Sequence, residues 1–307
     1  MNVGFIGLGQ MGTWMARHVA AKYPVKVYDR DPRAAAPVVS AGATAAGSAR
    51  EAAQGVDFLV TMLPGPEEIE ALMLGPGGVA DVLDDAAVWI DMSSSSGDCL
   101  QRIRDAHPDA SWRVLDAPVT GGVPGAQAGL LQVFVGGDRE DYERAFEVLA
   151  TMGDANRILH VGGPGLGYAV KLCINLGFFL NAFGAAEVLA LGTKAGLDLG
   201  LLHRILVGSG TTSAFLENDM HHVFAGDYKE YFRLALALKD LRLAVDLGRR
   251  VGVPMEVSAL VEQIHRRALV TQGDGGQLLA IKQLEETAGV SFRLAAPDAP
   301  DTLGEEQ

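Results

Sequence analysis

The stretch Met1–Arg17, MNVGFIGLGQMGTWMAR, decides the fold predicted for this 307-residue chain. Its apolar residues 3–6 are typical of a buried parallel strand, and residues 11–21 are typical of a helix. The glycines between them have the spacing G-x-G-x-x-G, which allows a tight turn, close approach of a pyrophosphate and packing of helix on strand. The helix N-terminus offers N–H groups to phosphates. The turn is therefore predicted to bind a dinucleotide through Gly7, Leu8, Gly9, Gln10, Met11 and Gly12.

An acidic residue follows the second predicted strand, Val25–Tyr28. Asp29 at this position can accept hydrogen bonds from the adenine ribose hydroxyls and repel a 2′-phosphate. The alternative is a turn residue, because Asp29, Asp31 and Pro32 also resemble a loop. Arg30 favours NADP instead, since an arginine here can hold a 2′-phosphate. We predict NAD as the cofactor and keep NADP as the alternative.

The composition limits the possible classes of protein. Apolar residues make up 49% of the chain, which fits a globular protein of two domains. The net charge is −13 and the basic residues do not cluster, so no nucleic-acid partner is expected. Cys99 and Cys173 lie far apart, and the histidines and acids form no ligand set. We therefore expect no metal and a compartment in which thiols stay reduced.

Neither a targeting segment nor a membrane span is expected. The first residues begin a strand at once, without the pattern of a signal peptide. The most apolar helical stretch, residues 172–191, is interrupted by Asn175, Asn181 and Glu187, which favours a core helix over a membrane span. These features predict a cytoplasmic protein with no membrane partner.

The order of predicted elements indicates two domains. Strands are predicted at 25–28, 58–63, 88–92, 113–116, 132–135 and 157–161, with helices at 66–73, 100–106 and 141–152. This alternation predicts an α/β Rossmann domain, a doubly wound parallel sheet, over residues 1–162. Helices alone follow, at 166–195, 198–207, 215–224, 232–251, 255–272 and 276–288. We predict an all-α C-terminal domain for substrate binding and dimerisation over 163–290, and a disordered tail over 291–307.

Two loops that end predicted strands are candidate contacts of the cofactor. Leu63 and Pro64 form one loop, and Ser94 lies in a run of four serines that forms the other. In a doubly wound sheet, ligands bind beyond the carboxyl ends of the strands. The alternatives stay open: the first loop equally suits a plain strand-to-helix turn, and the serines either bind a ribose or carboxamide or cap the next helix.

A third loop, Asp116–Gly122 (DAPVTGG), also follows a predicted strand. Thr120 supplies a hydroxyl, and Gly121 and Gly122 supply backbone N–H groups. Such a loop suits a carboxylate ligand. The alternative is a glycine hinge.

Two lysines lie on otherwise apolar helix faces. Gly167, Lys171 and Asn175 are spaced i, i+4, i+8 on one face among leucine, alanine and phenylalanine, and burying a lysine and an amide unpaired is costly. Partial desolvation would lower the pKa of Lys171 and let it donate a proton to a carbonyl oxygen. The alternative is a lysine that reaches solvent. Lys239 shares a face with Leu236 and could likewise turn inward or form a surface ion pair.

Taken together, these motifs resemble the β-hydroxyacid dehydrogenase family, which includes 3-hydroxyisobutyrate dehydrogenase, tartronate semialdehyde reductase and 6-phosphogluconate dehydrogenase. GFIGLGQMGTWMA is similar to the family's dinucleotide signature, DAPVTGG to its D-x-P-V-S-G-G, GYAVKLCIN to its G-x-x-x-K-x-x-x-N, and KDLRLA to its K-D-x-x-L-A. The similarity runs from residue 1 to about residue 290. Four motifs in register are highly specific, although each alone is not.

The resemblance implies a role for each motif. Lys171 would be the general acid in reduction and accept the alcohol proton in oxidation, with Asn175 orienting it or the substrate. The substrate would be a small hydroxyacid held by Ser94, Thr120, Gly121, Gly122 and Lys239. The cofactor would be contacted by Leu63, Pro64, Ser94 and Lys239, and the protein would be a homodimer or homotetramer. Thr120 stands where the family has serine, and its extra methyl narrows the pocket.

Two rival functions remain. One is an NADPH-dependent imine reductase, a relative in which the catalytic lysine is replaced. The other is a non-catalytic dinucleotide-binding protein that has lost that lysine. The presence of Lys171 argues against both.

Overall fold

The computed structural model describes residues 1–228 and 232–294. They form two compact units, Met1–Cys173 and the part from Ile174 onward. The division falls within the long helix α8 (Leu166–Lys194), and not at the predicted boundary after residue 162. The first turn of α8 belongs to the first unit because Tyr168 is buried in a core cluster of that unit.

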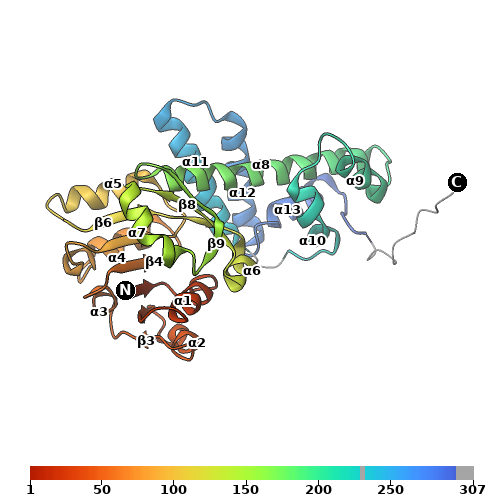
Figure 1. The fold of residues 1–307 in the computed structure, drawn as a ribbon. Coiled ribbons are helices and arrows are strands. Elements are labelled where there is room, and N and C mark those ends of the chain that lie inside the picture. Colours follow the sequence, from red (N-terminus) through yellow and green to blue (C-terminus); the bar gives the residue numbers. More distant parts are fainter. Residues whose placement is uncertain (229–231, 295–307) are drawn as a thin grey trace. The chain divides into compact units, whose positions relative to one another are not determined.

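The first unit is built on a nine-stranded sheet with the order β3-β2-β1-β4-β5-β6-β8-β7, and β9 pairs with β8 (Figure 1). The strands are β1 (Val3–Ile6), β2 (Val25–Tyr28), β3 (Thr44–Ala45), β4 (Phe58–Thr61), β5 (Val88–Asp91), β6 (Arg113–Asp116), β7 (Val119–Thr120), β8 (Leu131–Gly136) and β9 (Gly153–Gly162). β1 to β6 are parallel, and their order is that of a Rossmann fold. β8 runs antiparallel to β6 and β7, and β9 runs parallel to β8. The sheet that was predicted to be parallel is therefore mixed on the side beyond β6.

Helices connect these strands. They are α1 (Gly12–Ala20), α2 (Ala36–Val39), α3 (Ala49–Ala53), α4 (Pro66–Leu74), α5 (Gly97–Ala106), α6 (Gly122–Ala128) and α7 (Arg139–Leu149), with 3₁₀ turns η1 (Pro32–Ala35) and η2 (Ala80–Val82). α5 begins earlier than residue 100, where it was predicted, because the Ser96 side chain accepts a hydrogen bond from the Cys99 N–H and caps it. Sequence analysis missed α6, whose glycines and proline are poor helix formers.

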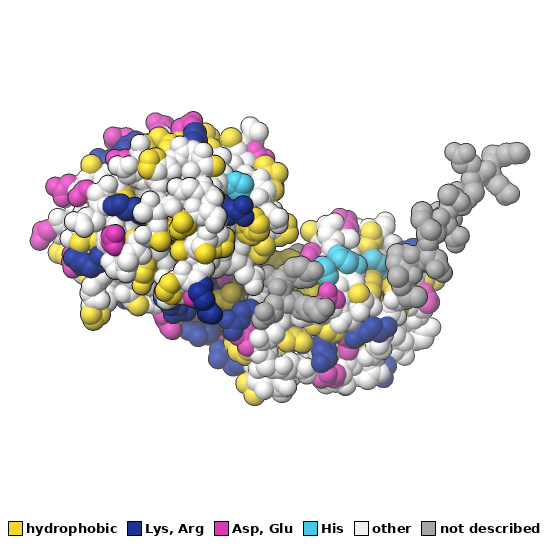
Figure 2. Space-filling view, turned by 90° about the horizontal axis from the view of Figure 1, so that it is seen from below, with side chains coloured by type: hydrophobic (Ala, Val, Ile, Leu, Met, Phe, Trp, Pro, Cys, Tyr) yellow, Lys and Arg dark blue, Asp and Glu magenta, His cyan; other side chains and the backbone are white. Residues whose placement is uncertain are grey.

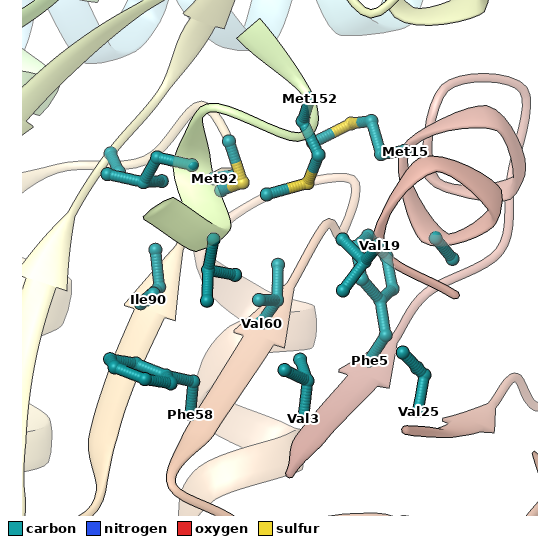
Figure 3. Packing of buried hydrophobic residues seen from close by; sticks show 14 of the residues in the cluster. Val3, Phe5, Met15, Val19, Val25, Phe58, Val60, Ile90, Met92 and Met152 are labelled. Atoms are coloured by element: carbon teal, nitrogen blue, oxygen red, sulfur yellow. The ribbon is translucent and has the colours of Figure 1, made fainter. Parts of the chain in front are cut away.

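The central strands are buried on both faces of the sheet. Along β4, Phe58 and Val60 belong to one core cluster and Leu59 to another. β5 alternates in the same way, with Trp89 in the second cluster. Figure 3 shows the first cluster, where side chains of β1, β4 and β5 point to the side on which Met15 and Val19 of α1 lie. Burial on both faces explains the continuous apolar runs in the sequence.

The second unit is helical. It contains the rest of α8, then α9 (Leu199–Val207), a π-helical turn η3 (Phe215–Asp219), α10 (Met220–Phe224), α11 (Leu234–Val251), α12 (Glu256–Gln272) and α13 (Leu279–Ala288). α11 packs beside α12, and α12 beside α13. The expectation of an all-helical second half agrees with these elements, apart from ends that differ by a few residues.

The tail predicted from residue 291 is wrong for residues 291–294. Phe292 is fully buried in the core of the second unit, and its N–H donates to Glu285 Oε1 at 2.7 Å. Burial of this aromatic ring outweighs the polar composition around it. Residues 295–307 lie outside the described part of the chain.

α8 is, by length and composition alone, apolar enough to cross a membrane. About a third of its most apolar window, 33%, is buried within the protein. A core helix passes the same test, so the absence of a membrane partner stays a prediction.

Candidate active site

The glycine turn between β1 and α1 fits a pyrophosphate. A Cβ on Gly7 would lie 2.2 Å from the Met62 carbonyl oxygen, and one on Gly12 would lie 2.0 Å from the Gly7 carbonyl oxygen. The protein's own packing therefore requires these two glycines. A Cβ on Gly9 would meet nothing within 4 Å, so the space beside it is open. No side chain caps α1 and its first turn holds no acidic residue, so the positive end of the helix dipole meets no opposing charge from that turn.

Asp29 at the end of β2 holds this turn in place. Its Oδ2 accepts the Leu8 N–H at 2.7 Å, and its Oδ1 accepts the Asp31 N–H at 2.8 Å. The side chain is only half-buried, and Arg30 beside it is exposed. Asp29 is thus the loop residue of the alternative interpretation, and its free lone pairs still allow it to accept ribose hydroxyls. The side chain of Leu8 is in the core, so only its backbone can contact a cofactor.

The loop after β4 lies beside the glycine turn, as the contact of Met62 with Gly7 requires. Leu63 is half-buried and Pro64 is exposed. The Leu63 N–H donates to Ser93 Oγ at 2.8 Å, so this loop is bonded to the loop after β5. Both loops end adjacent parallel strands, β4 and β5, at one edge of the sheet.

The serines after β5 have different roles, and the capping alternative is confirmed for Ser96. Ser93 is buried and its hydroxyl donates to Asp91 Oδ1 at 2.7 Å. Ser96 caps α5. Ser94 is half-buried, and its cofactor role stays a prediction.

The loop Thr120–Gly122 joins β7 to α6. Thr120 is paired with Gln132 of β8 and is half-buried, whereas Gly121 and Gly122 are exposed. Both glycines have positive φ, 125° and 60°, which other residues rarely adopt. No side chain caps α6. This backbone conformation suits the predicted carboxylate site, which stays a prediction.

Two buried aspartates at adjacent strand ends bind the first turn of α8, and sequence analysis assigned neither of them a role. Asp116, at the end of β6, accepts the Gly165 N–H at 2.7 Å and the Tyr168 N–H at 2.9 Å, and so caps the helix. Asp91, at the end of β5, accepts the Tyr168 O–H at 2.5 Å. The signal available in the sequence was an aspartate at the end of each of two neighbouring strands.

Burial controls the protonation of this cluster. It raises the pKa of Asp116 to about 6, against the lowering effect of the two backbone N–H donors and with a smaller repulsion from Asp91. Burial also raises the pKa of Asp91, although hydroxyl donors from Thr61, Tyr168 and Ser93 favour its ionised form. The pKa of the Tyr168 phenol is raised well above its usual value by burial and by the neighbouring carboxylates.

Lys171 lies one turn after Tyr168 on α8 and is half-buried. Gly167 is buried, and a Cβ there would lie 2.3 Å from the Asp116 carbonyl oxygen and 2.5 Å from that of Phe134. The helix thus begins in direct contact with β6 and β8. Cys173 is exposed, because its position on the helix turns it away from the buried positions 167, 168 and 172.

Asn175, Asp240 and Lys239 form a network in the second unit. Asn175 Nδ2 donates to Asp240 Oδ2 at 2.6 Å. Lys239 Nζ lies 3.0 Å from Asp240 Oδ1, and the lysine side chain is 20% exposed. Lys239 is therefore drawn partly inward, and its ion pair is made with the buried Asp240 and not with a surface residue. Asp240, fully buried, was missed by sequence analysis although it belongs to the KDLRLA motif.

Two protein-family models together match most of the chain. Residues 2–162 match the family model described as the NAD binding domain of 6-phosphogluconate dehydrogenase. Residues 165–284 match the model described as NAD-binding of NADP-dependent 3-hydroxyisobutyrate dehydrogenase. Both halves of the chain are thus of the oxidoreductase type that uses NAD or NADP.

Relatives match over nearly their full length. The chain is 36% identical to 2-(hydroxymethyl)glutarate dehydrogenase of Eubacterium barkeri, over 95% of this chain and 97% of the relative. It is 34% identical to 3-hydroxyisobutyrate dehydrogenase of Pseudomonas aeruginosa, over 86% and 90%. The structure of Mycobacterium tuberculosis 3-hydroxyisobutyrate dehydrogenase with L-serine is similar with a TM-score of 0.83 at 29% identity, covering 92% of this chain and 98% of that one. The chain therefore belongs to the β-hydroxyacid dehydrogenase family.

Proposed function

We propose that this protein oxidises small β-hydroxyacids of the form HOCH₂–CH(R)–COO⁻ to their semialdehydes, and reduces the semialdehydes in reverse, with Lys171 as the general base and acid. One observation supports this most directly. Asp91 and Asp116, at the carboxyl ends of β5 and β6, bind the helical turn that precedes Lys171. The same edge of the sheet carries the glycine turn, and ligands of such sheets bind at that edge.

The substrate class rests on the chemistry shared by the relatives' substrates. 2-(Hydroxymethyl)glutarate and 3-hydroxyisobutyrate, named for two relatives, both contain HOCH₂–CH(R)–COO⁻. A carboxylate of this kind suits the backbone N–H groups of Gly121 and Gly122 and the hydroxyl of Thr120. No motif identifies the residues that would contact the group R.

The chemistry divides between protein and cofactor. A bound nicotinamide dinucleotide supplies the hydride acceptor in oxidation and the hydride donor in reduction. In oxidation, the neutral Lys171 amine accepts the proton of the substrate hydroxyl as the carbonyl forms. In reduction, the Lys171 ammonium donates that proton to the carbonyl oxygen. Asn175, held by Asp240, would orient Lys171 or the substrate.

We propose NAD as the preferred cofactor. The Asp29 carboxylate at the end of β2 would repel the 2′-phosphate of NADP. Arg30 is the counterargument, because it is exposed beside Asp29. Leu63, Pro64, Ser94 and Lys239 are retained as proposed contacts of the cofactor, and Ser94 and Lys239 also of the substrate.

We also propose a cytoplasmic homodimer or homotetramer. In the second unit, α8 and α9 expose large hydrophobic side chains: Val188, Leu191, Leu201 and Ile205. Figure 2 shows that hydrophobic side chains are interspersed with charged ones on the visible surface. Light scattering after gel filtration tests the assembly, and a monomer at micromolar concentration would contradict it.

The test of the catalytic role is Lys171→Ala, with Lys194→Ala in the last turn of the same helix as control. The assay measures NAD⁺ reduction with 3-hydroxyisobutyrate, L-serine and 2-(hydroxymethyl)glutarate. We expect Lys171→Ala to lower kcat by about 10²–10⁴-fold while NAD⁺ binding persists. The control should retain full activity. Turnover by Lys171→Ala close to that of the wild type would contradict the proposal, and faster reduction of a cyclic imine than of any semialdehyde would favour the imine reductase.

A further inference from the structure

Tyr168 is a buried phenol one turn before Lys171, with no part in the chemistry described above. Its side chain is 1% exposed and packs in the core cluster that includes Trp89, Cys99 and Leu100. At this depth its hydroxyl reaches Asp91 Oδ2 at 2.5 Å. Residues at i and i+3 lie on the same side of a helix, so a rotation of Tyr168 about the helix axis also rotates Lys171.

Asp91 is itself firmly held. Its Oδ1 accepts the Thr61 hydroxyl at 2.6 Å and the Ser93 hydroxyl at 2.7 Å. Because Ser93 Oγ accepts the Leu63 N–H, one carboxylate is bonded on one side to Tyr168 and, through Ser93, to the proposed cofactor loop on the other. A network that is satisfied throughout and buried is stiff.

The same helical turn is fixed at two further points. Asp116 accepts hydrogen bonds from the N–H groups of Gly165 and Tyr168, and so fixes where the start of α8 lies along the helix axis. Gly167 contacts the carbonyl oxygens of β6 and β8 and sets the distance of the helix from the sheet. Both contacts act on the backbone, close to the helix axis, whereas the Tyr168 hydroxyl is bonded at the far end of a side chain, where the same rotation causes a larger displacement. That is the particular contribution of the Tyr168 hydroxyl.

We propose that Tyr168 is the positioning residue of Lys171, and that Asp91 anchors the lysine-bearing turn and the loop of Leu63 together. This rests on the proposed function for its catalytic consequence, but the orientation of Lys171 can be measured without catalysis. A phenylalanine at 168 would fill the same hydrophobic space. The Tyr168 hydroxyl therefore fixes the orientation of the helical turn and is not needed to fill the space around the ring.

The test compares Tyr168→Phe with Tyr142→Phe in the full-length protein. Tyr142 is a suitable control because its hydroxyl also makes one hydrogen bond in the first unit, to the Ile158 carbonyl oxygen at 3.1 Å. The first readout is the rate of reductive methylation of the Lys171 amine as a function of pH, followed by peptide mass spectrometry. The second is kcat and KM with 3-hydroxyisobutyrate and NAD⁺.

We expect Tyr168→Phe to change the methylation rate of Lys171 by about threefold or more and to move the midpoint of its pH profile, because the helical turn before Lys171 loses the hydrogen bond that orients it. kcat should fall about tenfold, with KM for NAD⁺ changed less than about twofold. Tyr142→Phe should match the wild type in every readout. Asp91→Asn, which keeps an oxygen acceptor, provides a second variant with an intermediate effect in case Tyr168→Phe folds poorly.

A Lys171 methylation profile in both Tyr168→Phe and Asp91→Asn that overlays the wild type would overturn the positioning role. This result is distinguishable from failure of the proposed function. If Lys171→Ala keeps its turnover, the catalytic role of the lysine is lost, while the methylation profiles still decide whether Tyr168 orients it.

Discussion

Asp29 and Asp116 do the same work in two different settings. Each lies at the carboxyl end of a parallel strand, and each accepts two backbone N–H groups. Asp29 is half-buried and organises the glycine turn, whereas Asp116 is fully buried and caps α8. Water therefore helps to stabilise the charge of Asp29, but burial raises the pKa of Asp116 to about 6. A carboxylate costs little at the surface and much inside, even with the same number of donors.

The difference bears on function. Burial disfavours the charged form of Asp116, but its two hydrogen bonds hold the turn that precedes Lys171. The half-buried Asp29 is proposed instead to act in the choice between NAD and NADP. The following experiments test this contrast, in order of decreasing expected effect.

The largest effect is expected for Gly167→Ala beside Asp116. The new Cβ would lie 2.3 Å from the Asp116 carbonyl oxygen, so α8 must move away from β6. We expect the free energy of unfolding to fall by about 1–3 kcal/mol and kcat by about tenfold or more. Gly184→Ala on the same helix is the control, since its Cβ would meet nothing within 4 Å. It should be neutral or stabilise by about 0.5–1 kcal/mol. Equal effects of the two variants in denaturant titrations would show that the close contact does not matter.

The next prediction concerns pH and Asp116→Asn. The pKa of this carboxyl in the folded protein, about 6, lies above its usual 3.8, so the folded state binds the proton more tightly. Its contribution to stability is fully present below pH 3.8 and is lost as the pH rises through 6. Between pH 4 and 7 the unfolding free energy of the wild type should therefore fall by about 2–3 kcal/mol relative to Asp116→Asn. Parallel stability curves would contradict the raised pKa.

A smaller effect is expected at the half-buried Asp29. Asp29→Ala should weaken NAD⁺ binding about tenfold, because the ribose loses acceptors and the glycine turn loses the hydrogen bond that the Leu8 N–H donates to Asp29. Arg30→Ala is the matched variant and should leave NAD⁺ binding unchanged. Titration of both with NAD⁺ and NADP⁺ checks this. A wild type that prefers NADP⁺, and loses that preference in Arg30→Ala, would reverse the proposed cofactor choice.

The smallest effect is expected for Thr120→Ser. The hydroxyl remains and only a methyl group is removed, so kcat/KM for 3-hydroxyisobutyrate should change by less than about threefold. Thr120→Val keeps the shape but loses the hydroxyl, and should lower kcat/KM by about tenfold through KM. Steady-state kinetics with the two variants separates hydrogen bonding from pocket size. Full kcat/KM in Thr120→Val, with a loss in Thr120→Ser, would indicate that Thr120 acts by shape alone.

The sequence could predict those parts of the candidate site whose conformation is local, and the roles of their residues stay predictions. The glycine turn, residues 7–12, and the Thr120–Gly122 loop each consist of consecutive residues, so their conformation follows largely from local backbone preference. The roles of Asp91, Asp116 and Tyr168 could not be predicted in this way. Their hydrogen bonds join residues 49 to 77 positions apart, and only the pairing of β5 with β6 brings them together.

The sequence by itself determined the Rossmann sheet, the helical second half and the family, because hydrophobic periodicity and glycine spacing act over short distances. Tertiary structure alone decided that Phe292 is buried, that β8 runs antiparallel to β6, and that two buried carboxylates fix the turn before Lys171. The physical reason is that burial and long-range hydrogen bonding depend on which distant residues meet. No local pattern in the chain encodes that meeting.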